Sequence, residues 1–208
     1  MSYVEYDAAL DEMYDRIGEE LYPEHSAKAI EEFTADHLRS FYLKHPEVMC
    51  PALLSYREAK ALHETSHYAA ALVFFVTSIE QFLKATLLKP VVFGLIHNDG
   101  LADVVVQYAL GQSGFDRYKS LLSQLFTDIA GIDLNEIRRE GVGKSVLDEA
   151  LDIQKTRNKI IHQGVSCSEA DSALAKDVAT LVFGKIVVQM LNVLGLDVHE
   201  KGLIKPSV

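Results

Sequence analysis

The stretch SVLDEALDIQKTRNKIIHQG, residues 145–164, has the periodicity of an amphipathic helix that ends at a glycine. Its apolar residues recur at intervals of three and four, the spacing that places them on one helical face. Ser145, followed three residues later by Asp148, resembles a capping box with Asp in place of the usual Glu or Gln. Gly164 suits the left-handed position that follows many helices. We therefore predict a helix over 145–162.

Arg157 falls on the apolar side of this predicted helix. With an advance of about 100° per residue from Leu147, Arg157 lies at about 280°, inside an apolar arc from about 220° to about 40°. Asn158 lies at the margin of the arc, and His162 lies just outside it. The opposite face carries polar residues: Asp148, Asp152, Lys155, Thr156 and Lys159. An ionised guanidinium on the apolar side needs a charged partner or a solvated cleft.

Glu80 is the other ionisable group on a largely apolar helical surface, between Val73 and Val76 in projection. We therefore expect Glu80 to contact Arg157, orienting and neutralising it. Two interpretations stay open. In the first, the pair is structural, with Asn158 capping locally and His162 bonded to backbone. In the second, Arg157 and His162 line a cleft for phosphate chemistry, because arginine offers a fork of donors to phosphate and histidine titrates near neutrality.

The same helical periodicity runs through the rest of the chain, so we predict an all-α fold. The expected helices cover 4–21, 27–43, 52–88, 98–110, 115–130, 145–162 and 169–194, with breaks at prolines and glycines such as Pro90 and Gly131. No repeat or low-complexity linker marks a domain boundary. We expect a helical bundle over 51–208 and an acidic helical extension over 1–50, which packs on the bundle, swaps between subunits or gates the cleft.

The charge of the chain is −10 and is unevenly placed. Residues 1–32 hold ten Asp or Glu and two Lys or Arg, a net −8, which leaves −2 for the remainder. An acidic chain argues against non-specific polyanion binding but leaves room for a local phosphate site. Cys50 and Cys167 form no CxxC pair, the chain starts without a signal-peptide pattern, and the apolar stretch 69–76 is too short to span a bilayer. We expect a cytoplasmic protein with no membrane segment.

The sequence HETSH, from His63 through Glu64 to His67, matches the HExxH pattern of zinc proteases. A third ligand is missing, because the metzincin continuation needs Gly and His where Ala70 and Val73 stand. Glu80 would lie about 20 Å along an unbroken helix from His67. We therefore interpret the motif as a polar helix face and expect no metal site, with a zinc hydrolase as a distant alternative.

The sequence EGVGKS, residues 140–145, resembles the end of a phosphate-binding P-loop. The full pattern requires a glycine at position 138, where Arg138 stands, and a preceding buried strand in a region that reads as helical. A turn followed by the Ser145 cap explains these residues.

The segment RNKIIH, residues 157–162, resembles the Rx4-6H motif of the HEPN superfamily, the higher eukaryotes and prokaryotes nucleotide-binding domains. The earlier helix HYAAALVFFVTSIEQFLKATLL, with one embedded glutamate, also resembles the first core helix of such domains. The two helices and the chain between them cover roughly residues 60–195. The resemblance implies an α-helical bundle that dimerises so that two copies of the motif face one cleft.

Many members of that superfamily are metal-independent endoribonucleases, often toxins of toxin–antitoxin or antiphage systems, and others are non-catalytic binding domains. Carried over by position, Arg157 and His162 would be the catalytic pair, Asn158 an auxiliary polar residue, and Glu80 a looser match. The first reading is therefore a cytoplasmic, homodimeric ribonuclease without a cofactor, acting on RNA with a separate antitoxin or defence partner. The alternative is a nucleotide-binding or protein-interaction module of the same fold.

Overall fold

The computed structural model describes residues 35–96, 99–105 and 119–207. Helix accounts for 73% of the interpretable residues and strand for 5%, which confirms the all-α class. The predicted helix over 4–21 lies outside the described residues. The same holds for residues 27–34, 98, 106–110 and 115–118 of three further predicted helices.

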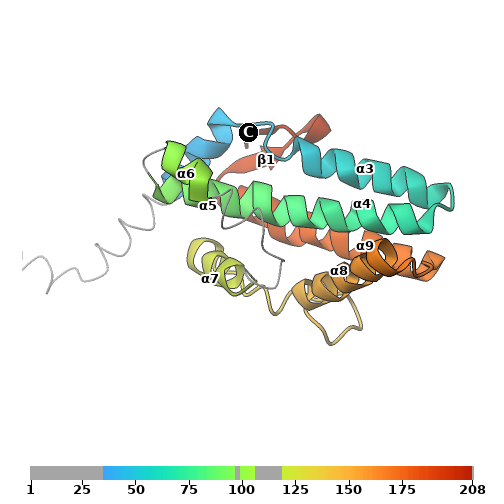
Figure 1. The fold of residues 1–208 in the computed structure, drawn as a ribbon. Coiled ribbons are helices and arrows are strands. Elements are labelled where there is room, and N and C mark those ends of the chain that lie inside the picture. The colour runs from blue at the N-terminus through green and yellow to red at the C-terminus, as the bar shows by residue number, and fades with distance from the viewer. Residues whose placement is uncertain (1–34, 97–98, 106–118, 208) are drawn as a thin grey trace, which may run out of the picture.

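Helices α3 (Cys50–Glu64) and α4 (Tyr68–Gln81) form an antiparallel pair (Figure 1). The prediction of one helix over 52–88 is therefore wrong. The chain reverses at Ser66, whose φ of 62° is left-handed, and the N–H of His67 bonds to the carbonyl of Leu62 at 2.8 Å. The Thr65 hydroxyl donates to the carbonyl of Ala61 at 3.0 Å, so polar groups of the turn satisfy the open end of α3.

Helix α4 continues without a break through the π-helical segment η1 (Phe82–Leu88) into α5 (Lys89–Leu95). The predicted break at Pro90 is therefore wrong. Pro90 follows η1 directly, and the carbonyl of Thr86, four residues before it, accepts the Tyr42 hydroxyl in place of the N–H that proline lacks. A second π-helical segment, η4 (Val182–Val187), joins α9 (Glu169–Leu181) to α10 (Val188–Val193), so the helix predicted over 169–194 is present.

The stretch Tyr68–Phe93 is long and apolar enough to cross a membrane by length and composition. Of its most apolar part, 65% is buried inside the protein, which is typical of a core helix. Buried side chains on this helix include Leu72, Phe75 and Phe82. The ring of Phe82 packs against that of Phe183 at 5.3 Å, which places the two π-helical segments side by side in the core.

Residues 35–44 form a helix that packs on this core, although we assigned them to the N-terminal extension. Leu38, Tyr42 and Met49 are buried, and the Tyr42 hydroxyl donates to the carbonyl of Thr86 in η1. Burial raises the pKa of Tyr42 far above its usual value. Residues 35–50 therefore share one hydrophobic core with the bundle.

A short antiparallel hairpin, β1 (Leu196–Val198) and β2 (Ile204–Pro206), closes the chain and was not predicted. The 3₁₀ turn η5 (Glu200–Gly202) connects the strands. Gly202 has a φ of +87°, and a Cβ there would stand 2.6 Å from the Leu53 side chain. The N–H of Ile204 bonds to the carbonyl of Pro46, so the hairpin is fixed to the loop before α3.

Helices α7 (Lys119–Ala130) and α8 (Val146–Gln163) lie on the side of α4 and α9 away from the hairpin (Figure 1). Helix α6 (Asp99–Val105) follows α5 at the opposite end of the long helix from the α3–α4 turn. Residues Val146, Leu147 and Ile153 of α8 are buried against the core. The arrangement leaves the C-terminal turns of α8 at the surface, next to α4.

Candidate functional site

Helix α8 begins and ends within one residue of the predicted limits, with Ser145 and Gly164 as its caps. The Ser145 hydroxyl oxygen accepts the N–H of Asp148 at 3.2 Å, and Gly164 ends the helix with a φ of 65°. The N–H of Gly164 bonds to the carbonyl of Ile160 at 3.1 Å, which satisfies a terminal carbonyl. These two caps fix which residues fall in the last turns, and therefore fix the positions of Arg157 and His162.

Arg157 is half-buried on the core side of α8, as predicted. Its Nη1 donates to Oδ1 of the neighbouring Asn158 at 3.1 Å. Its Nε is buried without a hydrogen-bond partner, and Thr86 Oγ1 is the other such side-chain atom in the described part of the chain. Among the described residues no carboxylate forms an ion pair with this guanidinium. No described carboxylate therefore neutralises the charge of this arginine.

Glu80 faces α8 but does not pair with Arg157. Its Oε1 accepts a hydrogen bond from Nε2 of Gln154 at 2.7 Å. Because Gln154 precedes Arg157 by three residues, Glu80 lies within one helical turn of the arginine along α8. The expected ion pair is therefore wrong, although both groups lie at the same α4–α8 contact.

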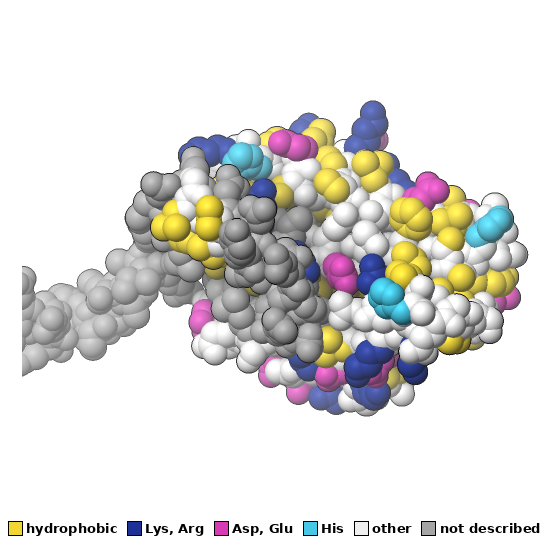
Figure 2. Space-filling model, in the orientation of Figure 1, with side chains coloured by type: hydrophobic (Ala, Val, Ile, Leu, Met, Phe, Trp, Pro, Cys, Tyr) yellow, Lys and Arg dark blue, Asp and Glu magenta, His cyan; other side chains and the backbone are white. Residues whose placement is uncertain are grey.

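His162 is exposed in the last turn of α8, five residues after Arg157. Asn158 is exposed between them. Figure 2 shows acidic, basic and histidine side chains close together on the surface over α4 and α8. Arg157, Asn158 and His162 follow Gln154 within eight residues on α8, and Gln154 contacts Glu80, so the four predicted site residues lie in one region.

The residues of HETSH do not share a helix. His63 lies in the last turn of α3, and His67 precedes the first residue of α4. His63 Nδ1 hydrogen-bonds the buried Ser172 hydroxyl on α9 at 2.9 Å, whereas His67 Nδ1 contacts Thr65 Oγ1 at 3.1 Å. Glu64 is exposed and lies 3.9 Å from the Lys60 ammonium. Over the described ranges, no three His, Cys, Asp or Glu side chains are grouped so that they could hold a metal ion.

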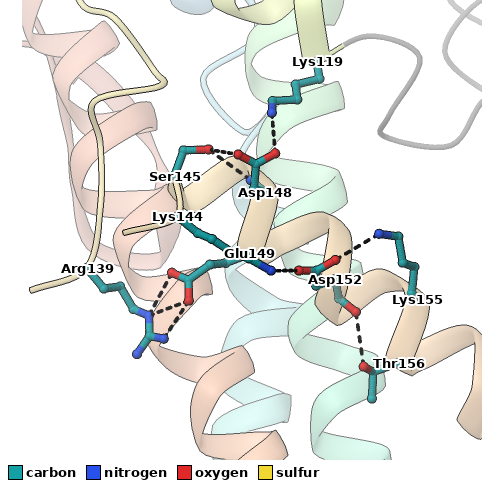
Figure 3. Close-up of polar contacts among 9 residues, drawn as sticks. All are labelled: Lys119, Arg139, Lys144, Ser145, Asp148, Glu149, Asp152, Lys155 and Thr156. Atoms are coloured by element: carbon teal, nitrogen blue, oxygen red, sulfur yellow. Dashed lines mark hydrogen bonds and ion pairs between the residues drawn. The ribbon is translucent and has the colours of Figure 1, made fainter. Parts of the chain in front are cut away.

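The EGVGKS segment forms the turn and cap that we predicted. Lys144 Nζ donates to Asp152 at 2.7 Å, and the Ser145 hydroxyl caps α8 (Figure 3). The residue at the missing glycine position, Arg138, forms a single β-bridge with Ser145. Lys144 and Ser145, the residues that would contact phosphate and magnesium in a P-loop, therefore stabilise the turn and cap the helix instead.

A buried ion pair between Arg139 and Glu149 was missed by the sequence reasoning. The guanidinium forks onto the carboxylate, with Nη2 2.6 Å from Oε1 and Nε 2.9 Å from Oε2 (Figure 3). The Glu149 side chain is 8% exposed and that of Arg139 is 27% exposed. The hydrogen bond with Glu149 raises the pKa of Arg139. The only sequence signal was that Glu149 lies beside the apolar arc of α8.

Comparison of the chain with protein-family models, with curated proteins and with solved structures finds no match. The described residues define an all-α protein in which an arginine without a described ion-pair partner and an exposed histidine lie near the end of one helix.

Proposed function

We propose that the protein is a metal-independent endoribonuclease of the HEPN type, with Arg157 and His162 as its catalytic pair. The observation that carries the proposal is the half-buried Arg157 guanidinium, which has an unpartnered Nε and no ion pair among the described residues. A buried donor without a partner costs roughly 1–3 kcal/mol, and more for a charged group. A phosphate at the site would supply the counter-charge that the described residues do not.

The chemistry requires a base, an acid and a cation. One His162 accepts the proton of an RNA 2′-hydroxyl, and the 2′-oxygen bonds to the adjacent phosphorus while the bond to the 5′-oxygen breaks. The His162 of a second copy protonates the leaving 5′-oxygen, and Arg157 stabilises the charge on the phosphorane. The products are a 2′,3′-cyclic phosphate and a 5′-hydroxyl, and the proposed reaction uses no metal ion.

A second copy of the chain is part of this proposal, because one His162 cannot act as base and acid in the same step. Exposed apolar side chains lie in the last turn of α8 and just after it, at Ile161 and Val165, and on α4 at Phe74, and they favour such a contact. Apolar side chains gathered on an exposed face are typical of protein–protein contacts.

The proposed cellular role follows the resemblance: a cytoplasmic toxin or antiphage effector held in check by a separate partner protein. Induced expression in a bacterial host is the test. Wild type is expected to stop growth, and His162→Ala, expressed to the same level, is expected to permit it. Equal growth of the two strains would refute the toxic role and leave the chemistry to be judged in vitro.

The biochemical test is incubation of purified protein with a pool of structured and single-stranded RNA in excess EDTA. Wild type is expected to leave 2′,3′-cyclic phosphate ends, whereas Arg157→Ala and His162→Ala are expected to be inactive. The matched control is His199→Ala, because His199 is an exposed histidine before η5, away from α8.

Cleavage that requires a metal, or that survives both substitutions, would refute the proposed site. If wild type and all variants cleave no RNA, the result favours the alternative, a non-catalytic binding module. Retained binding of RNA or of a nucleotide would then be the property to measure.

A further inference from the structure

The C-terminal half of α8 is basic in a chain that is acidic overall. Residues 153–168 contain three Lys or Arg and one His, and no Asp or Glu, whereas the whole chain has a net charge of −10. The last carboxylate before this stretch is Asp152, and the next is Glu169 at the start of α9. The excess of positive charge is therefore local to the region that holds His162.

Two exposed lysines, Lys155 and Lys159, precede His162 on the same side of α8. Lys155, Lys159 and His162 succeed one another at intervals of four and three residues, so they lie within about 60° of one another around the helix axis. All three side chains are exposed, and that of Lys155 is 72% exposed. They form one face, about 10 Å long at 1.5 Å per residue. We call these three residues the basic face.

The carboxylate of Asp152 does not neutralise this face. It accepts hydrogen bonds from Nζ of Lys155 at 2.9 Å and from Nζ of Lys144 at 2.7 Å, so two lysines share one negative charge (Figure 3). Within the described part of the chain, Lys159 has no ion-pair partner at all. Of the three residues of the basic face, Lys159 therefore keeps its charge free of any described carboxylate, and Lys155 shares its carboxylate with Lys144.

Helix stability alone does not account for both lysines. Basic side chains in the last turn of a helix interact favourably with its dipole, but the effect falls off within that turn. His162 and Lys159 are close enough to Gln163, the last residue of α8, to benefit. Lys155 stands two turns before that end, beyond the effect of the dipole, and its exposed pair with Asp152 three residues earlier stabilises a helix by only about 0.2–0.5 kcal/mol.

We propose that the basic face binds the sugar-phosphate backbone of RNA and leads it to His162. The inference rests on the proposed function, because RNA is the polyanion that a ribonuclease must bind. Contacts of lysine with phosphate position a nucleic acid without reading its sequence. Residues 153–168 contain no aromatic side chain on which bases could stack, so the face is expected to hold RNA with little preference for base.

The test measures binding apart from cleavage. The probe is a fluorescent single-stranded oligouridylate, and every variant carries His162→Ala so that the probe stays intact under the proposed mechanism. The variant of interest is Lys155→Gln/Lys159→Gln. Its matched control is Lys201→Gln/Lys205→Gln, which removes two exposed charges from the hairpin on the other side of the bundle (Figure 1).

Each phosphate contact to a single strand contributes about 0.7 to the dependence of log affinity on log salt. The loss of both lysines is expected to reduce that slope by about 1.4 and to weaken binding roughly 25-fold at 0.1 M salt. The control variant is expected to bind as its parent does. Poly-uridylate and poly-adenylate are expected to compete equally, and polyglutamate at equal charge is expected not to compete.

Unchanged affinity and slope in the Lys155→Gln/Lys159→Gln variant would overturn the inference, whether or not its melting temperature falls. So would the absence of any RNA binding, or stronger competition by polyglutamate than by RNA. The two proposals fail separately. Binding through the lysines without cleavage by wild type removes the ribonuclease, whereas cleavage that is unaffected by Lys155→Gln/Lys159→Gln removes only the basic face.

Discussion

Gln154 on α8 donates a hydrogen bond to Glu80 on α4, at 2.7 Å between Nε2 and Oε1, and no carboxylate of the described residues forms an ion pair with Arg157. The pair joins the two helices one turn before the arginine. A neutral amide therefore satisfies the acid, and the positive charge of the site remains available for an anion.

The first prediction concerns this contact between α4 and α8. Glu80→Ala is expected to lower the free energy of unfolding by about 1–2 kcal/mol, since it removes a half-buried hydrogen bond to a charged group. Gln154→Ala is expected to cost at least as much, because it leaves the carboxylate without its donor. Urea denaturation measures both. Equal stability of wild type and Gln154→Ala would contradict the contact.

Arg157 is expected to behave as a functional residue whose removal does not harm the fold. A half-buried charge without an ion pair contributes little net stability, so Arg157→Met is expected to change the free energy of unfolding by less than about 1 kcal/mol, or to raise it. RNA cleavage is expected to be lost in the same variant. Arg57→Met, at an exposed arginine of α3, serves as the control.

A loss of about 3 kcal/mol or more in Arg157→Met would instead mark the arginine as structural. That result would favour the non-catalytic module. Activity and stability must therefore be measured on the same preparation.

The ion pair of Arg139 and Glu149 is expected to show an asymmetric response. Arg139→Met leaves a carboxylate that is 8% exposed without its counter-charge, and breaking such a buried pair costs roughly 3–5 kcal/mol. Glu149→Met leaves an arginine that is more exposed and lies 3.9 Å from Asp177, so a smaller loss is expected. The measurement is the free energy of unfolding, by heat or urea, of the two single variants and of the double variant. The prediction fails if Glu149→Met is the more damaging change.

His63 is expected to be a structural residue. His63→Ala leaves the buried Ser172 hydroxyl without its partner, so a loss of about 1–2 kcal/mol is expected, and the double variant with Ser172→Ala is expected to recover part of it. Elemental analysis is expected to find no stoichiometric zinc in wild type. Zinc that is present in wild type and absent from His63→Ala would restore the hydrolase alternative.

The parts of the structure that were predictable are those that local sequence determines. Ser145 and Gly164 bound α8, and the helical period places Arg157 on its buried side, because both signals depend only on residues a few positions apart. The contacts of Gln154 with Glu80 and of Arg139 with Glu149 were not predictable. They depend on how α4, α8 and the loop before α8 meet in space.

Two errors in the fold have similar causes. The turn at Ser66 is formed by polar residues that also fit an exposed helix stripe, so periodicity gave no signal for it. The hairpin after α10 has strands of three residues, too short to show the alternation that predicts a strand. In both places the local pattern is compatible with more than one structure, and packing selects between them.

The carboxylates on the exposed side of α8 are expected to set the acid limit of stability. Hydrogen bonds from Lys144 and then Lys155 lower the pKa of Asp152 to about 2, and the lysine and serine partners of Asp148 also lower its pKa. An unfolded aspartate has a pKa of about 3.9, so the stabilisation is complete above about pH 4 and is lost as the pH falls towards 2. Asp152→Asn is expected to cost about 0.5–1 kcal/mol at neutral pH and to make the decline below about pH 4 shallower. The measurement is the free energy of unfolding from about pH 5 to about pH 2, with Glu58→Gln, at an exposed glutamate of α3, as the control. An acid decline equally steep in Asp152→Asn and in wild type would show that Asp152 contributes nothing to it.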